Sequence, residues 1–532
     1  MARLGQFIRY CFEEKPLLFC MWTALVLRML AVVFSQGIAF GFDHYVYIEN
    51  AQNIVSGSLT FPALSQDMEY ESFSRHGYSL IYLIGNTGIF YVLEFFNIFD
   101  PRGKMFILRL FHALISLYVI YYSYRLAYRL ANRKAALAVG LMAASLWFIP
   151  FLSVKSLPEN ISAIFILAGI YRFAKTNKRN YKYGDDLFVG LLLGCSSAFC
   201  LNSLFFVAGF VVVVGLLSGK RRSLLLMLGA AISVFVNEGI VNTICLGTPF
   251  YIIREYFSAV FEGSLTTHGA KTIYMYISIL ALMMPFPWGI LAMIGYIKSW
   301  KRTFLLFFPV TFYIVMCYLL PYKGEQFILP IMPLFFIICL AGWYRYWGNS
   351  RFWVSKPRLR YWITTLFFIV NTPVLLLTCF AFVRKPQVET MMYLSHYKND
   401  ISSIMVENST LSNCKSLPLF YLGKNVPVFL LNKREEEPDA SIYYCTEKVS
   451  SYEKELYTEK YFLHCKKEHI PQFVVFYGSK DIPERLAKMR KIFPMIVHEK
   501  TIKPSYADLL INLVNSGNEN DEIQIYRTDY QE

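Results

Sequence analysis

The stretch "GFDHYVYIENAQNIVSG", residues 41–57, follows directly on the first long apolar run of the sequence. It is neither continuously apolar nor composed of turn residues. Asp43, Tyr47 and Ala51 recur every four residues, so a helix over this stretch places all three on one face. A carboxylate thus heads a stripe of side chains just after a segment of membrane-spanning length. Its role depends on the side of the membrane that it faces.

The composition indicates a membrane protein. The chain has 532 residues, of which 55% are hydrophobic and only 17% charged, and its mean hydropathy is +0.39. A soluble domain carries about a quarter charged residues. Apolar runs of about 20 residues recur from Pro16 to Phe382, which predicts an α-helical polytopic membrane protein. In such a protein Lys and Arg lie mainly in the loops and set the orientation, so the net charge of +15 does not indicate a nucleic-acid partner.

Several classes of function are disfavoured by missing motifs. The sequence has no Gly-rich phosphate loop, no CxxC pair and no HExxH motif, which argues against a nucleotide-driven pump or a zinc hydrolase. We therefore expect no metal site and no resident cofactor, and we leave open whether the protein needs a divalent cation. The first apolar run is too long for a cleavable signal peptide and lacks a small-residue cleavage site, so we expect it to span the membrane.

The distribution of Lys and Arg predicts the orientation. With eleven spans and the N-terminus inside, 23 Lys and Arg fall in inner segments and seven in outer loops. If residues 78–96 crossed the membrane, every later loop would move to the opposite side and the basic clusters would lie outside. We therefore predict that this aromatic stretch lies in the outer interface as a helix or helical hairpin. The run Leu187–Leu217 is predicted to be two short spans that turn near Asn202, with one tilted span as the alternative. The predicted spans are residues 17–41, 106–123, 135–152, 160–173, 187–201, 203–218, 223–243, 273–297, 303–320, 327–344 and 361–383.

After the last apolar run the composition becomes polar. We predict a transmembrane domain of residues 1–383 and an extracytoplasmic C-terminal α/β domain of residues 384–532. Cys414, Cys445 and Cys465 in the second domain allow at most one disulfide. The α/β prediction comes from strand-like runs and one helix-like run, "VPVFLL", "ASIYYC", "QFVVFYG", "EIQIYRT" and "IPERLAKMRKIF".

Ionisable groups gather on the predicted outer side. Each has a simple explanation by itself: a lone Asp at the end of a span is usually hydrated, a Lys there usually snorkels, and Glu159 in "SLPEN" can serve a helix dipole. Their convergence on short outer loops favours a functional site, because ionisable groups at membrane depth are costly and more often functional. The outer candidates are Asp43, His44, Arg75, Lys155, Glu159, Glu262, His268 and Lys323.

The first-loop stripe resembles a known signature. Asp43, Tyr47 and Ala51, followed by Gly57, are similar to the "DE-x2-Y-x3-A" motif of the protein mannosyltransferase-like branch of membrane glycosyltransferases of the GT-C fold. These enzymes use sugars linked to a lipid phosphate. His44 stands in place of the second acid. The resemblance implies a GT-C-type helical domain with interfacial helices in its first outer loop.

Later segments resemble glycosyltransferase family 22, the dolichyl-phosphate-mannose enzymes. The stretch "YKGEQFILPIMPLFF", residues 322–336, is similar to "HKE-x-RFI-x-P-x-x-P". Lys323 matches, whereas Tyr322, Gly324 and Gln326 stand where that family has His, Glu and Arg. Two further similar stretches are "VFEGSLTTHGAKTIYMYI" (260–277), with His268-Gly269 in place of a Tyr-Gly pair, and "CKSLPLFYLGKNVPVFLL" (414–431), which resembles a "CHSTP" segment.

The resemblance implies an inverting hexosyl transfer, most simply of mannose, from a polyprenyl- or dolichyl-phosphate donor to a glycan or glycolipid acceptor. Asp43 would be the base that takes the proton of the acceptor hydroxyl. The donor phosphate needs positive charge, and Lys323 is the first choice to supply it. The lesser candidates for the donor phosphate are Arg75, His268 and Lys155, and those for the sugar or acceptor are His44, Glu159 and Glu262.

Two alternatives stay open. A transporter or lipid flippase would use the outer charges as a gate, but the sequence has no repeated block and a carrier has no obvious use for the C-terminal domain. An enzyme of the same fold would instead move another sugar, such as aminoarabinose, to lipid A or a surface glycan. The divergence from the eukaryotic motifs favours a bacterial inner membrane over the endoplasmic reticulum, with the active site on the outer face in either case.

Overall fold

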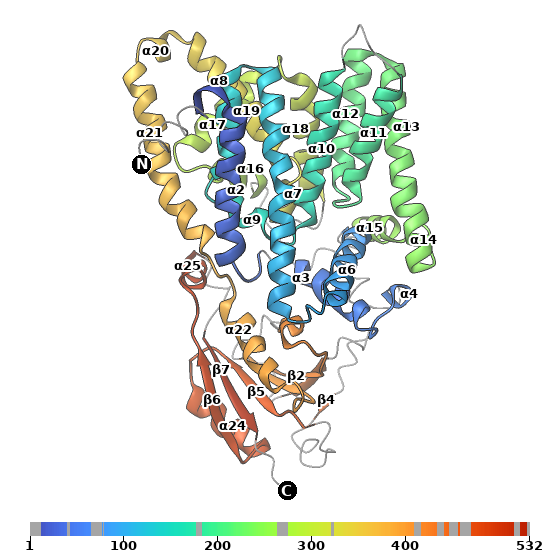
Figure 1. Cartoon of the computed structure of the whole chain (residues 1–532), viewed down its shortest axis with the longest axis vertical. Coiled ribbons are helices and arrows are strands. Elements are labelled where there is room, and N and C mark those ends of the chain that lie inside the picture. The colour runs from blue at the N-terminus through green and yellow to red at the C-terminus, as the bar shows by residue number, and fades with distance from the viewer. Residues whose placement is uncertain are drawn as a thin grey trace. The chain divides into compact units, whose positions relative to one another are not determined.

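A computed structural model of the chain describes residues 12–39, 43–64, 77, 79–176, 183–262, 275–320, 324–408, 417–432, 441–445, 456–457, 470–514 and 522–528. The chain divides into two compact units. The first comprises Met1–Val33, Glu71–Gly85 and Leu108–Phe380; the second comprises Phe34–Tyr70, Asn86–Ile107 and Ala381–Glu532. In its described part the first unit consists of helices, whereas the second combines helices with a β-sheet (Figure 1).

Helices form over the predicted apolar runs. Four are long and apolar enough to cross a bilayer, namely Pro16–Phe34, Pro101–Leu130, Lys220–Leu246 and Pro357–Cys379. The count of eleven crossings remains a prediction. The helices of this part are α2 (Pro16–Phe34), α7 (Pro101–Leu130), α8 (Arg133–Ser145), α9 (Ile149–Ser153), α10 (Pro158–Lys175), α11 (Tyr183–Ser197), α12 (Ser203–Ser218), α13 (Lys220–Val234), the π-helix Phe235–Ile240, α14 (Val241–Leu246), α15 (Tyr251–Glu262), α16 (Met275–Leu282), α17 (Trp288–Ser299), α18 (Phe304–Leu319), α19 (Met332–Asn349), α20 (Arg351–Val354) and α21 (Pro357–Cys379).

The long uncharged run between Leu187 and Leu217 is broken where the sequence predicts a turn. Helix α11 ends at Ser197 and α12 begins at Ser203. Asn202 in the break accepts a hydrogen bond of 2.7 Å from the Tyr256 hydroxyl. The run is therefore two helices and not one.

Contacts between loops follow the predicted sides. Basic segments predicted to lie inside contact one another in two sets, one that joins residues 129, 172–186 and 222 and one that joins Lys298 to Tyr346. Arg129 donates to the Ala174 carbonyl at 2.7 Å, and Arg172 donates to Asp185 at 2.5 Å. Arg222 donates through Nε and Nη2 to the two carboxylate oxygens of Asp186, each at 2.8 Å. The Lys298 ammonium lies 4.7 Å from the centre of the Tyr346 ring.

Segments predicted to lie outside form a second group. Leu201, Tyr256 and Leu320 pack in one hydrophobic cluster that joins three of these segments. Gly77 lies against Tyr256 and Leu201, and the Tyr276 hydroxyl donates to the Gly324 carbonyl at 3.3 Å. Both groupings are what the predicted orientation requires, and they support it without showing which end faces the cytoplasm.

Small residues bring α11 and α13 into backbone contact. A Cβ atom at Gly190 of α11 would lie 2.2 Å from the Leu226 carbonyl oxygen, and one at Gly229 of α13 would lie 2.2 Å from the Leu187 carbonyl oxygen. Gly190 and Gly194 form a GxxxG pair, the spacing that lets membrane helices approach closely. This pair of helices therefore depends on the absence of side chains at three positions.

We predict that Gly190→Leu destabilises the protein, because the new side chain meets backbone that cannot move aside. The cost expected for overpacking is about 1–3 kcal/mol or more. Gly184→Leu, in the same helix, is the matched control, since no described atom lies within 4 Å of a Cβ there. The thermal midpoint of the purified protein in detergent should fall for Gly190→Leu alone. Equal midpoints for both variants would contradict the close packing.

The second unit contains a seven-stranded sheet in the order β4-β3-β2-β1-β5-β7-β6. Strand β1 pairs parallel with β2 and β5, and the other pairs are antiparallel. The four strands and the helix predicted here are confirmed as β2, β3, β5, β7 and α24. The bounds are β1 (Ile404–Asn408), β2 (Val428–Asn432), β3 (Ser441–Cys445), β4 (Leu456–Tyr457), β5 (Phe473–Tyr477), β6 (Ile496–Ile502), β7 (Ile523–Thr528), α22 (Lys385–Leu394), α24 (Ile482–Ile492) and α25 (Tyr506–Val514).

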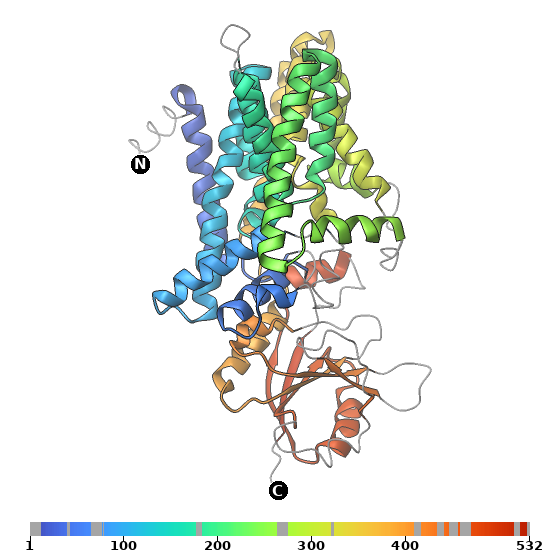
Figure 2. The ribbon, with the colours of Figure 1, turned by 90° about the vertical axis from the view of Figure 1, so that its right-hand side faces the viewer.

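Helices cover both faces of this sheet. Val474 and Phe476 of β5 pack with Met489 of α24 in one hydrophobic core. Phe473 points to the other face and contacts the Tyr397 ring, which follows α22, at 5.4 Å between centroids. Figure 2 shows α24 and α22 on opposite sides of the strands. The described residues after the last apolar run thus contain both strands and helices, while the extracytoplasmic C-terminal domain of residues 384–532 remains a prediction. Cys414 and Cys465 lie outside the described residues, so the disulfide prediction is open.

The predicted helices of the first loop are present. Helix α3 (Asp43–Val55) covers the stripe, and α6 (Leu80–Phe95) covers most of residues 78–96, with the short α4 (Phe61–Leu64) between them. A 3₁₀ helix, η6 (Leu419–Leu422), comes from the segment after β1. The location of α6 in a membrane interface remains a prediction.

Candidate active site

The stripe headed by Asp43 is the buried face of α3. Tyr47 is 5% exposed and Ala51 is fully buried, as the four-residue spacing predicts. Asp43 is the first residue of the helix and His44 the second. The side chains of these two lie outside what the structure describes. The backbone nevertheless places Asp43, the predicted base, at the start of α3, and the contacts described next hold the later part of this helix.

Aromatic rings join α3 to η6. The Tyr45 ring stacks on Tyr421 at 5.9 Å between centroids, and Phe420 stacks on Phe90 of α6 at 5.6 Å. The Phe420 amide donates to Glu49 Oε1 at 3.4 Å. Burial raises the pKa of Tyr45 well above its usual value, and the nearby Tyr421 and Glu49 raise it further. Two segments singled out by resemblance, the first loop and residues 414–431, are therefore in direct contact.

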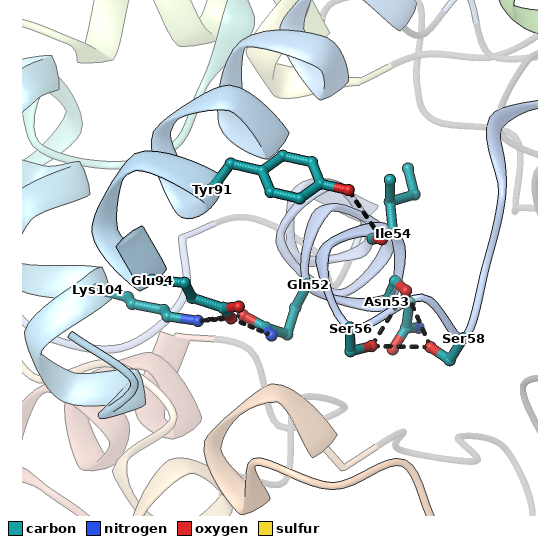
Figure 3. A network of polar contacts seen from close by, with 8 residues as sticks. All are labelled: Gln52, Asn53, Ile54, Ser56, Ser58, Tyr91, Glu94 and Lys104. Atoms are coloured by element: carbon teal, nitrogen blue, oxygen red, sulfur yellow. Dashed lines mark hydrogen bonds and ion pairs between the residues drawn. The ribbon is translucent and has the colours of Figure 1, made fainter. Parts of the chain in front are cut away.

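A buried lysine ties α3 to α6 and α7 (Figure 3). Lys104, 2% exposed, donates to Glu94 Oε1 at 2.6 Å and to Gln52 Oε1 at 2.7 Å. The Gln52 amide in turn donates to Glu94 at 3.1 Å. Burial would raise the pKa of Glu94, but the hydrogen bonds from Lys104 and Gln52 outweigh it and lower that pKa. The three side chains lock the middle of α3 in place.

Lys155 and Glu159 lie close together in the first unit, in and just after the turn between α9 and α10. They are 5% and 4% exposed. Burial lowers the pKa of Lys155 well below its usual value, and the charge of Arg109 on α7 lowers it further. Two cations and a carboxylate are thus buried among the outer segments, where low dielectric strengthens any charge interaction.

His112 lies one turn beyond Arg109 on α7. Its Nδ1 donates to the Leu108 carbonyl at 2.9 Å, which leaves Nε2 to accept from the Tyr82 hydroxyl at 2.9 Å. This pair of bonds defines one neutral tautomer. Arg109 and His112 were not among the sequence candidates, although ionisable residues inside a predicted span are a recognisable signal.

The remaining candidates are only partly placed. Arg75, His268 and Lys323 lie outside the described residues. Glu262 is the last residue of α15, and its side chain is not described. The structure therefore brings together Lys155 and Glu159 and adds Arg109. Among the described residues, no group of three or more His, Cys, Asp or Glu side chains could hold a metal ion.

Residues 19–418 match the Alg9-like mannosyltransferase family. The chain belongs to the Alg9-like mannosyltransferase family. The match runs from α2 through the described turn before η6, so it includes the first-loop helices as well as the apolar helices. None of the curated proteins matches the sequence. Membership of this family supports a membrane glycosyltransferase rather than a carrier.

Solved structures agree with this assignment at the level of the fold. ArnT from Cupriavidus metallidurans in the apo state has a TM-score of 0.59 at 12% identity, over 99% of this chain and 98% of that one. The same protein bound to undecaprenyl phosphate has a TM-score of 0.58 at 12% identity, over 96% and 97%. Against the Archaeoglobus fulgidus oligosaccharyltransferase with zinc and sulfate, the TM-score is 0.44 at 10% identity, over 74% of this chain and 60% of that one. The likeness to ArnT supports the predicted GT-C fold, and this family member spans only 60% of the oligosaccharyltransferase.

We predict that Lys104→Met destabilises the protein, because the Glu94 carboxylate loses its donor. Breaking a fully buried pair costs about 3–5 kcal/mol, and about 1–3 kcal/mol is expected here because Glu94 retains some contact with water. The thermal midpoint of purified protein should fall accordingly. Adding Glu94→Gln to Lys104→Met should recover part of the loss, since no unpaired charge remains. A single variant as stable as the wild type would mean that the pair does not anchor α3.

Proposed function

We propose that this protein transfers a hexose, first of all mannose, from a polyprenyl- or dolichyl-phosphate donor to a glycan or glycolipid acceptor. Membership of a mannosyltransferase family supports the sugar, and the ArnT structure with bound undecaprenyl phosphate supports the type of donor. The observation that carries the proposal is the pair of buried cations, Lys155 and Arg109, among the outer segments. A phosphate anion is the ligand that such a pair fits best.

The electrostatics of this pair favour an anion. Burial lowers the pKa of Lys155, and repulsion from the nearby charge of Arg109 lowers it further. A bound phosphate would replace this repulsion with charge-assisted hydrogen bonds. As the bond to the sugar breaks, negative charge grows on the phosphate, and fixed cations stabilise the transition state more than the ground state. Lys323, Arg75 and His268 remain further candidates for the same phosphate.

Asp43 is proposed to be the base. In an inverting transfer the acceptor hydroxyl attacks the anomeric carbon and loses its proton to a carboxylate. The leaving group is a lipid phosphate of low basicity, so no general acid is needed. With His44 in place of the second acid, the role falls on Asp43 alone. His44, Glu159 and Glu262 would then hold the acceptor or the sugar hydroxyls.

The site is proposed to face the extracytoplasmic side of a bacterial inner membrane, with the endoplasmic reticulum as the alternative. Eleven crossings, a transmembrane domain of residues 1–383 and an extracytoplasmic domain of residues 384–532 go with this orientation. The 23 basic residues of the inner segments and the separate grouping of inner and outer loop contacts support it.

A second candidate function is the same type of transfer with a sugar other than mannose. The likeness to ArnT covers 99% of the chain, including the C-terminal part that lies beyond residue 418, where the family match ends. Transfer of a different sugar, such as aminoarabinose, to lipid A or a surface glycan therefore deserves the same assay. Mass analysis of products formed from a panel of lipid-phosphate sugars separates the two candidates.

We predict that Asp43→Asn abolishes detectable transfer, because the amide is nearly isosteric but takes no proton. Loss of a general base costs about 10²–10⁴ in rate. The measurement is transfer of labelled mannose from its lipid-phosphate carrier by purified protein. His44→Ala should cost less. Turnover above about a tenth of the wild type in Asp43→Asn would direct the search to Glu49, Asp67, Glu69 or Glu71 in the same loop.

We predict that Lys155→Gln raises the KM for the donor, because one charged donor to the phosphate is lost. A charge-assisted hydrogen bond of about 1.5–3 kcal/mol corresponds to about 10- to 150-fold. Lys155→Arg should retain part of the affinity. Lys298→Gln, which alters a lysine of the inner group, is the control and should leave the KM unchanged. If Lys155→Gln and Lys298→Gln give the same KM, Lys155 does not bind the donor.

A further inference from the structure

Helix α25 carries an apolar face that the described part of the protein leaves uncovered. Tyr506 is 41% exposed, Leu509 52%, Leu510 51% and Leu513 83%. The opposite side holds the buried Ala507 and Asp508. The helix lies beyond one end of strands β6 and β7 (Figure 1). An amphipathic helix with a leucine-rich outer face and an aromatic ring is typical of a membrane surface.

Hydrogen bonds attach this helix to the segment that leaves the last apolar helix. Asp508 accepts from the backbone amides of Arg384 (2.6 Å) and Lys385 (3.2 Å), and the Ser505 hydroxyl donates to the Phe382 carbonyl at 2.6 Å. Ser505 and Asp508 also form a capping box at the start of α25, with bonds of 3.1 Å in both directions. The start of α25 is therefore fixed to residues 382–385.

Chain length then limits how far α25 lies from a bilayer. Helix α21, one of the four helices apolar and long enough to span, ends at Cys379. Arg384 follows it by five residues, a distance of at most about 18 Å for an extended chain. Because Asp508 is bonded to Arg384, the chain is short enough for the apolar face of α25 to reach the membrane boundary at which α21 would end.

A cleft beside α25 is lined by an excess of cations. Its volume is about 760 Å³, and Tyr506 and Ser505 form part of its wall. Lys385, Lys500 and Arg102 line it, against one carboxylate, that of Glu389. The Lys385 ammonium is 3.9 Å from Glu389, and the Lys500 ammonium lies 4.6 Å from the centre of the Tyr393 ring. The cleft therefore complements negatively charged headgroups.

We propose that α25 and this cleft form a membrane-contact site for anionic lipid. The apolar face of α25 enters the interface, and lipid phosphates bind Lys385, Lys500 and Arg102 in the cleft. Basic residues beside an amphipathic helix are the usual combination for binding an anionic leaflet. The lipid-contact site shares no residue with the proposed donor site or with the proposed base. The proposal therefore does not depend on which sugar is transferred.

The test uses the full-length protein in vesicles and a photo-crosslinking amino acid introduced at Leu513. Phosphatidylcholine vesicles with and without phosphatidylglycerol are compared, and adducts are identified by mass spectrometry. Position Lys488 on α24, 53% exposed, is the control. We expect lipid adducts at position 513, several-fold more of them when phosphatidylglycerol is present, and only background at position 488. Equal yields at the two positions, or a crosslink to a second copy of the chain, would overturn the proposal.

The cleft is tested in the same assay. Lys385→Glu together with Lys500→Glu should remove the gain in adducts that phosphatidylglycerol produces at position 513, while the yield in phosphatidylcholine alone stays the same. Both side chains are at least partly exposed, so elution of the variant as a single peak from size-exclusion chromatography verifies its folding. An undiminished gain in the folded variant would show that the cleft does not bind the lipid phosphates.

Discussion

The position of the proposed base depends on how α3 is held. A lysine as buried as Lys104 is costly unless its donors are satisfied, and here Glu94 and Gln52 satisfy it. The same contacts tie α3 to α6 and to the start of α7. The aromatic stack of Tyr45, Tyr421, Phe420 and Phe90 adds apolar packing beside this polar anchor. A reacting carboxylate needs such support, since small errors in position cost large factors in rate.

The amino-acid pattern predicted the elements more completely than it predicted their contacts. Hydrophobic runs located the helices, and the basic residues Lys220, Arg221 and Arg222, which a single span would place outside, favoured two spans with a turn near Asn202. The four-residue spacing from Asp43 to Ala51 predicted the buried face of α3. These successes share a cause, because each signal depends only on residues that are near one another in the chain.

The elements and site residues that the sequence did not predict lack such local signals. Strand β6, whose exposed positions include His498 and Lys500, lacks a clear alternation, and the sequence pattern did not predict β1 (Ile404–Asn408) either. Helices α22 and α25 are short and take their stability from tertiary contacts such as Asp508. The contacts of Arg109 and of Lys104 form only when helices that are distant in the sequence pack together. No local pattern carries that information, so the candidate site was predicted less completely than the fold.

The two units differ in how their polar groups are used. In the helical unit, the buried Lys155 lies close enough to Arg109 of α7 for the two charges to interact. In the second unit, charge serves assembly: Asp508 caps one helix and fixes the start of another. The proposed function would use both units, with apolar helix faces beside the lipid of the donor and polar groups beside the glycan.

The contact between Glu49 and Phe420 joins residues 371 positions apart, and this separation constrains the order of biosynthesis. Chains grow at about 5–20 residues per second, so about 20–75 s pass between synthesis of the first-loop helix and of its partner η6. During that interval the apolar helices from α7 to α21 are made while α3 still lacks its aromatic cover. Helix α3 therefore acquires its packing against η6 only after the helices from α7 to α21 have been synthesised.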